Sequence, residues 1–137
     1  MSGDVAVGDV VARATYPVER INLVMYAGAS GDFNPIHWNS RVARAAGLPD
    51  VIAHGMFTMA QAGRAVTDWV GGDPGRVESF AVRFTRPVVV PDPGRARIEV
   101  EVVVAEVRED GTVLLDITAT CDGEAVLGAA SAVVRPG

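Results

Sequence analysis

The sequence predicts an α+β fold in which an antiparallel sheet packs against one long helix. Helical patterns lie in the first half of the chain, and alternating apolar residues fill the second half. Glycine and proline residues separate these segments, at spacings typical of the length of one helix or strand. The sequence contains no internal repeat. A run of strands after a run of helices is typical of α+β domains. We therefore expect a single domain over residues 1–137.

The chain opens with an expected strand from Val10 to Val18 and a short helix from Glu19 to Ala27. In that helix the apolar positions Ile21, Val24 and Met25 share one face. A second short helix is expected to begin at a capping residue, Asn39 or Ser40, and to run through Ala46 to the helix-ending Gly47.

A longer helix is expected from Gly55 to Val70, where Gly71 and Gly72 end it. Its core face is predicted from residues at helical spacing, which are Met56, Met59, Ala60, Gly63, Val66, Thr67 and Val70. The small residues in the middle of this stripe would let a sheet approach closely. The pattern therefore permits a sheet that wraps around a central apolar helix.

Strict alternation of apolar residues predicts two antiparallel strands with one buried face, over residues 98–104 and 113–119. Short polar segments with glycine, at 109–111 and 121–123, supply hairpin turns. The flanking strands are expected at Val77 to Val90 and Glu124 to Val134.

The composition describes a folded chain, with 49% hydrophobic and 21% charged residues among 137. Its apolar runs are too short to span a bilayer, and no leader-like segment opens it, so we expect a cytoplasmic protein without a membrane partner. The formal charge of −5 argues against a nucleic-acid partner, since binding phosphates needs a positive surface.

The single cysteine, Cys121, cannot form an internal disulfide. It lies in a strand-like stretch with no histidine nearby, so we interpret it as a buried structural thiol. The two histidines, His37 and His54, are far apart in the sequence and form no metal-ligand motif. No metal site is expected.

Residues 30–37 place Asp32 and His37 five positions apart. This spacing does not fit one face of a helix, and Pro35 excludes the α region for Asn34, so both side chains are expected on a loop. Gly31 permits unusual dihedral angles before Asp32, and Asn34 and Pro35 favour a turn after it. A carboxylate and an imidazole on such a loop can move protons. The alternative is a surface turn with a capping aspartate and an exposed histidine.

Four segments of the sequence resemble the MaoC-like, or hydratase-2, family of (R)-specific enoyl-thioester hydratases and (3R)-hydroxyacyl-thioester dehydratases. They are Tyr-Ala-Gly-Ala-Ser-Gly-Asp before the loop, Asn-Pro-Ile-His-Trp within it, Ile-Ala-His-Gly-Met after it, and Val-Thr-Asp-Trp-Val at Val66 to Val70. Within this family the chain resembles the catalytic B subunits of mycobacterial-type (3R)-hydroxyacyl-ACP dehydratases. Many relatives have an acidic residue and a proline shortly after the histidine, whereas Trp38 follows here.

The resemblance implies a hot-dog fold and a hydro-lyase that interconverts trans-2-enoyl and (3R)-3-hydroxyacyl thioesters of CoA or ACP in fatty-acid metabolism, with no cofactor. It implies that Asp32 and His37 are the catalytic acid–base pair. The backbone N–H of Gly55, at the start of the long helix, would stabilise the thioester oxyanion; the alternative is a glycine needed only for the turn into the helix. Asn34 and Pro35 would support the loop.

Several expectations depend on this resemblance or compete with it. Arg83 and Arg86 lie on a strand face that is solvated by default, but they are candidates for contact with a carrier phosphate. His54 is expected to orient the site through hydrogen bonds, so that its replacement is milder than that of His37. Gly63 and Ala60 would leave room for acyl chains longer than four carbons, unless Gly63 only permits close packing.

Two other functions remain open. Hot-dog thioesterases usually carry their carboxylate on the central helix, where this chain has only Asp68, near the far end. A non-catalytic subunit that shapes an acyl tunnel would not need Asp32 and His37. Hot-dog domains generally pair, so we expect a homodimer or a heterodimer with a related hot-dog subunit.

Overall fold

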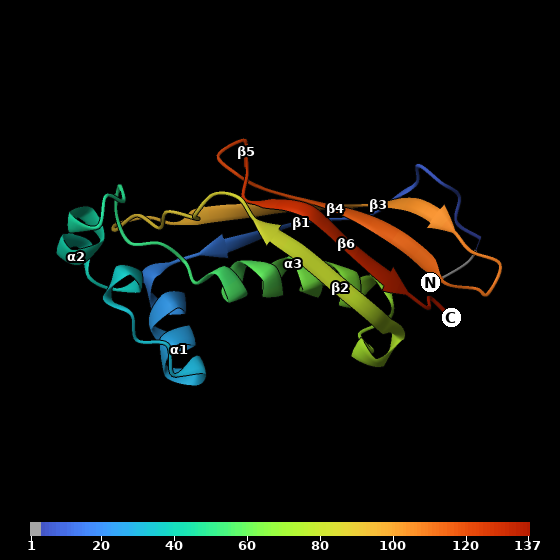
Figure 1. Cartoon of the computed structure of the whole chain (residues 1–137), viewed down its shortest axis with the longest axis horizontal. Helices are drawn as coiled ribbons and strands as arrows, with labels where there is room; N and C mark the ends of the chain where they lie inside the picture. Colours follow the sequence, from blue (N-terminus) through green and yellow to red (C-terminus); the bar gives the residue numbers. More distant parts are fainter. Residues whose placement is uncertain (1–3) are drawn as a thin grey trace.

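The computed structural model describes residues 4–137 and contains a six-stranded sheet with a long helix against one face (Figure 1). Its elements in chain order are β1 (Val10–Val18), α1 (Arg20–Ser30), η1 (Pro35–His37), α2 (Ser40–Ala45), α3 (Gly55–Trp69), η2 (Pro74–Arg76), β2 (Val77–Phe84), β3 (Ala96–Val107), β4 (Val113–Cys121), β5 (Glu124–Ala125) and β6 (Leu127–Val134). The strand order is β1-β3-β4-β6-β2, with β5 paired to β4, and these pairings are antiparallel. The predicted α+β fold is confirmed.

The core lies between α3 and the inner face of the sheet (Figure 1). The inner face of β3 alternates as predicted, with Ile98, Val100, Val102 and Val104 buried. Cys121 is also buried at the end of β4, and this burial raises the pKa of its thiol. The expectation of a buried thiol at this position is confirmed.

The core face of α3 agrees with the predicted stripe only in its last turns, where Val66 and Val70 are buried. Earlier in the helix the buried residues are Thr58, Ala62 and Ala65, whereas the side chain of Met56 is 58% exposed. The small Ala62 and Ala65 face inward because they allow the helix axis to approach the sheet. None of the helices within residues 4–137 is long and apolar enough to cross a membrane.

Helix α1 ends three residues later than predicted, and its shared apolar face lies on the exposed side. Leu23 and Ala27 are buried, but the predicted apolar face, Ile21, Val24 and Met25, is 57%, 53% and 64% exposed. These three residues share a face as predicted. In a single copy of the chain, that face is exposed to solvent. The helix ends at Gly31, whose φ of 76° requires glycine-like freedom.

Two predicted strands are shorter in the structure. The strand expected to run to Val90 ends at Phe84, because Pro87 cannot donate to a ladder, and only an isolated bridge joins Val89 to Ile52. The strand expected from Glu124 is interrupted at Val126 and divides into β5 and β6.

An arginine–carboxylate cluster fixes the segment that leads into α3. The guanidinium of Arg20 donates to the carbonyl of Val90 at 2.7 Å and pairs with Asp50 at 3.1 Å, and Arg44 pairs with Asp50 at 3.3 Å. A hydrogen bond from Ser40, one from the backbone of Val51 and the two arginines hold the pKa of Asp50 below its usual value. The cluster ties α1, α2 and the β2–β3 connection together around the loops described next.

Candidate active site

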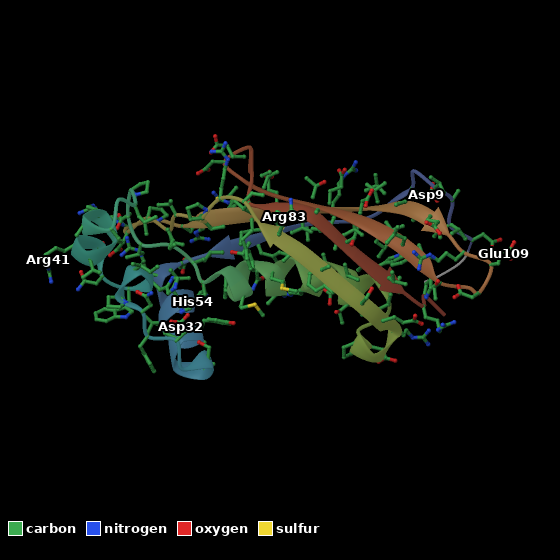
Figure 2. All side chains as sticks on the ribbon, in the orientation of Figure 1. Asp9, Asp32, Arg41, His54, Arg83 and Glu109 are labelled. Carbon is green, nitrogen blue, oxygen red and sulfur yellow. The ribbon has the colours of Figure 1, made fainter. Side chains whose placement is uncertain are left out.

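The candidate site is assembled where the loop after α1 meets the start of α3, at the end of the molecule that carries α1 and α2 (Figures 1 and 2). Asp32 follows the left-handed Gly31 and is exposed. Its backbone N–H donates to Ser30 Oγ at 3.1 Å, and its carboxylate accepts the N–H of Asn34 at 3.1 Å. The carboxylate is therefore held by its own loop.

Asn34 and Pro35 form the turn that the sequence predicted. The side chain of Asn34 accepts the N–H of Ile36 at 3.3 Å and so caps the short helix η1, in which Pro35 is the first residue. This turn brings His37 back toward the loop. Trp38 closes it by donating its indole N–H to the carbonyl of Phe33 at 3.0 Å.

His37 is 7% exposed, and its Nδ1 lies 2.7 Å from the carbonyl oxygen of Ile52. A carbonyl oxygen only accepts, so Nδ1 carries a hydrogen, and in the neutral imidazole Nε2 keeps a lone pair. This hydrogen bond orients the ring of His37 from Ile52, which lies 15 positions later in the sequence. In that form Nε2 is the ring atom able to accept a proton.

His54 comes directly before α3 and stacks on His37, with ring centroids 3.8 Å apart and planes at 19°. It is 3% exposed, and Tyr26 covers it from α1 with a centroid distance of 4.8 Å. Its Nε2 lies 3.0 Å from the carbonyl oxygen of Asp32. Figure 2 shows Asp32 and His54 close together beside α1.

One potential ligand atom each from Asp32, His37 and His54 lies within 4.8 Å of the other two. Nitrogen lone pairs lie in the plane of an imidazole ring, so two stacked rings cannot both direct a lone pair at one ion. Nε2 of His54 and Nδ1 of His37 are also engaged with carbonyl oxygens. The cluster therefore fits proton transfer better than metal chelation.

Gly55 is the first residue of α3, and its N–H precedes any carbonyl within the helix that could accept it. It lies between two cavities, which also share Phe84. One, of about 280 Å³, is lined by Tyr26, Ser30, Asp32, His54, Gly55, Met56 and Phe84. A carbonyl oxygen placed in it could meet a free N–H at the positive end of the α3 dipole.

The second cavity, of about 350 Å³, extends from Gly55 and Phe84 along the segment after β2 and includes Arg86. Arg83 lines neither of these two cavities. Phe84 pairs with the buried Leu127 and shares its face, so the neighbouring Arg83 points to the opposite, outer face of the sheet. The structure thus brings Arg86, and not Arg83, to the candidate site.

Sequence reasoning missed two contributors. Phe84 packs its ring 3.3 Å from the position that a Cβ of Gly55 would take, so it shapes both cavities. Tyr26 contacts His54 and lines the smaller cavity. Tyr26 opens the motif Tyr-Ala-Gly-Ala-Ser-Gly-Asp, so its place in the site could have been predicted from that motif. No local sequence pattern marks Phe84.

The chain matches a known protein family over most of its length. The model of the MaoC like domain matches residues 4–120. 3-Hydroxyacyl-thioester dehydratase Y of Mycobacterium tuberculosis is 36% identical over 117 residues, which cover 77% of this chain and 40% of that protein. The chain spans at most 40% of the first curated relatives that it matches.

Solved structures match more completely. A MaoC-like dehydratase has 41% sequence identity and a TM-score of 0.92, with 96% of this chain and 41% of that chain covered. An (R)-hydratase from A. caviae has 24% identity and a TM-score of 0.84 over 97% of this chain and 98% of its own. The latter supports the hot-dog fold alone. Together with the match over residues 4–120, these findings show that the chain belongs to the MaoC-like domain family.

Proposed function

We propose that this domain is the catalytic part of an (R)-specific hydro-lyase that interconverts trans-2-enoyl and (3R)-3-hydroxyacyl thioesters. The observation that carries the proposal is the convergence of Asp32 and His37 beside the free N–H of Gly55. Family membership and the dehydratase relatives support it. A cytoplasmic location remains a prediction.

In the hydration direction, His37 Nε2 takes a proton from water as the water oxygen bonds to the β carbon. Electron density moves to the thioester oxygen, where the N–H of Gly55 stabilises the enolate. Protonated Asp32 then gives its proton to the α carbon. The proton on His37 is then relayed through one water to the carboxylate of Asp32, since the two side chains place polar atoms within 4.8 Å of each other, and the cycle is complete. Dehydration runs these steps in reverse, and neither direction needs a cofactor.

The carrier would be CoA or ACP, whose pantetheine is linked to phosphate. Arg86 borders the larger cavity, and its ion pair with Glu124 is long, at 3.6 Å. Because this pair is weak, the guanidinium could turn toward a phosphate. We therefore retain Arg86 as the candidate phosphate contact and withdraw Arg83, which lies on the outer face.

We also propose that the domain pairs with a second hot-dog domain, either a copy of itself or a related subunit. The exposed face of α1, formed by Ile21, Val24 and Met25, supports this, as does the open edge of the sheet at β2. Light scattering on the wild type and on Val24→Glu tests it. A dimer that becomes a monomer in the variant supports pairing through α1; an unchanged dimer would place the interface elsewhere.

The activity is tested with crotonyl-CoA and the wild-type protein. Loss of the conjugated double bond without release of thiol, and a (3R) product by chiral analysis, are expected. Release of free thiol would indicate the thioesterase alternative, and a (3S) product would contradict the proposed stereochemistry.

A further inference from the structure

We propose that His54 is a positioning residue, which holds the backbone of Asp32 and the ring of His37 in the geometry that proton transfer requires. The inference rests on the proposed function of Asp32 and His37 and adds a third residue to it. His54 would act through these two side chains, without exchanging a proton with the substrate.

The first observation is the hydrogen bond between His54 and the catalytic loop. The other hydrogen bonds of Asp32 within residues 4–137 are local, since they join it to Ser30 and Asn34, each two positions away. His54 Nε2 reaches the carbonyl of Asp32 across 22 positions. Because Asp32 is exposed and His54 is 3% exposed, this bond anchors a solvent-facing loop to a buried point at the start of α3.

The second observation is that the two histidines donate to carbonyl oxygens from opposite ring nitrogens. Both hydrogen-bond to carbonyl oxygens, which only accept, but His37 does so through Nδ1 and His54 through Nε2. His54 Nδ1 is buried and has no hydrogen-bond partner in residues 4–137. A hydrogen on that atom would meet no acceptor, so the geometry fits the Nε2–H tautomer.

The third observation is the ring stack. His37 is held in its plane by Ile52 at one edge and by the face of His54 at 3.8 Å. The ring of Tyr26 in turn backs His54. Small displacements of catalytic groups are costly, since a misplacement of about 1 Å can lower a rate about 10²-fold. A residue that fixes both members of the pair is therefore expected to influence kcat.

The tautomers can be read directly from the wild-type protein. The chain contains two histidines, so long-range ¹H–¹⁵N correlation spectra at neutral to mildly alkaline pH give two resolvable ring systems. We expect His54 as the Nε2–H tautomer and His37 as the Nδ1–H tautomer, with assignment from His54→Gln. A protonated Nδ1 on His54 would overturn the proposal. This result does not depend on activity, so it separates failure of the inference from failure of the proposed function.

Kinetics of a matched pair of variants tests the consequence. His54→Phe keeps an aromatic ring stacked on His37 and removes the N–H donor to Asp32. It should lower kcat with crotonyl-CoA by about 5- to 30-fold and change KM by less than about 2-fold. This is the loss expected when one hydrogen bond is removed and the loop it held is displaced. His54→Gln keeps a donor and should recover part of this loss. An unchanged kcat in His54→Phe would overturn the proposal. A loss equal to that of His37→Ala in both His54→Phe and His54→Gln would make His54 a catalytic residue instead, since the donor kept in His54→Gln would then recover nothing. Circular dichroism checks that each variant is folded. If a variant does not fold, the tautomer measurement on the wild-type protein tests the proposal by itself.

Discussion

A Cβ atom on Gly63 would lie 3.0 Å from Cε2 of Phe80, because the phenyl ring of this β2 residue packs directly on α3. The space beside Gly63 is therefore filled by protein. Of the two interpretations of this glycine, the structure agrees with close packing of helix and sheet and leaves no opening there for an acyl chain.

Gly63→Leu should destabilise the fold and leave the substrate preference unchanged. The added side chain overpacks against Phe80, which costs about 1–3 kcal/mol in free energy of unfolding. Urea denaturation measures this cost, and the ratio of specificity constants for eight-carbon and four-carbon enoyl-CoA should change less than about 2-fold. Ala60→Leu, on the exposed side of α3, is the matched control and should unfold like the wild type. A collapse of the chain-length ratio at unchanged stability would restore the tunnel interpretation.

Arg86→Ala should raise KM for crotonyl-CoA by about 5- to 30-fold with little change in kcat. The guanidinium borders the cavity next to Gly55, and a charge-assisted hydrogen bond to phosphate at an exposed site is worth about 1–2 kcal/mol. Arg83→Ala, on the outer face of the same strand region, removes the same charge and should leave KM unchanged. Equal effects of both variants would show a general charge effect and contradict a specific contact.

Asp50→Asn should lower Tm at neutral pH, and the difference from the wild type should shrink as the pH falls below about 4. The pKa of Asp50 is held below its usual value of about 3.9, so its ionised form stabilises the folded state above that pH. This stability is lost as the pH falls through the lowered pKa. Asp116→Asn, on an exposed position of β4, controls for the loss of one negative charge. A difference in Tm that persists unchanged to low pH would contradict a role for the ionised carboxylate, which accepts hydrogen bonds from Ser40 and Val51 and faces the two arginines.

Much of the fold could be predicted because local pattern determines it. Alternation located β3 and β4, and the glycine and proline residues around Asp32 placed the candidate pair on a turn. The orientation of α1 could not be predicted, since periodicity shows that Ile21, Val24 and Met25 share a face but not whether another part of the chain covers that face.

The same limit applies to the site. Sequence spacing put Asp32 and His37 on one loop as a candidate pair, and the position of Gly55 at the start of a helix followed from pattern. The bond from His54 to the carbonyl of Asp32 depends on how two loops meet in space, and the packing of Phe84 on Gly55 depends on where β2 ends. Such contacts arise from tertiary structure and leave no local signal in the sequence.

The most direct test of the account is the rate of crotonyl-CoA hydration by Asp32→Asn and His37→Ala, each compared with the wild type by circular dichroism. Both side chains are placed by loop hydrogen bonds outside the apolar core, so the fold should survive. We predict that kcat falls by about 10²- to 10⁴-fold in each variant, as expected for loss of a positioned acid or base. Wild-type activity in either well-folded variant would contradict the assignment of this pair.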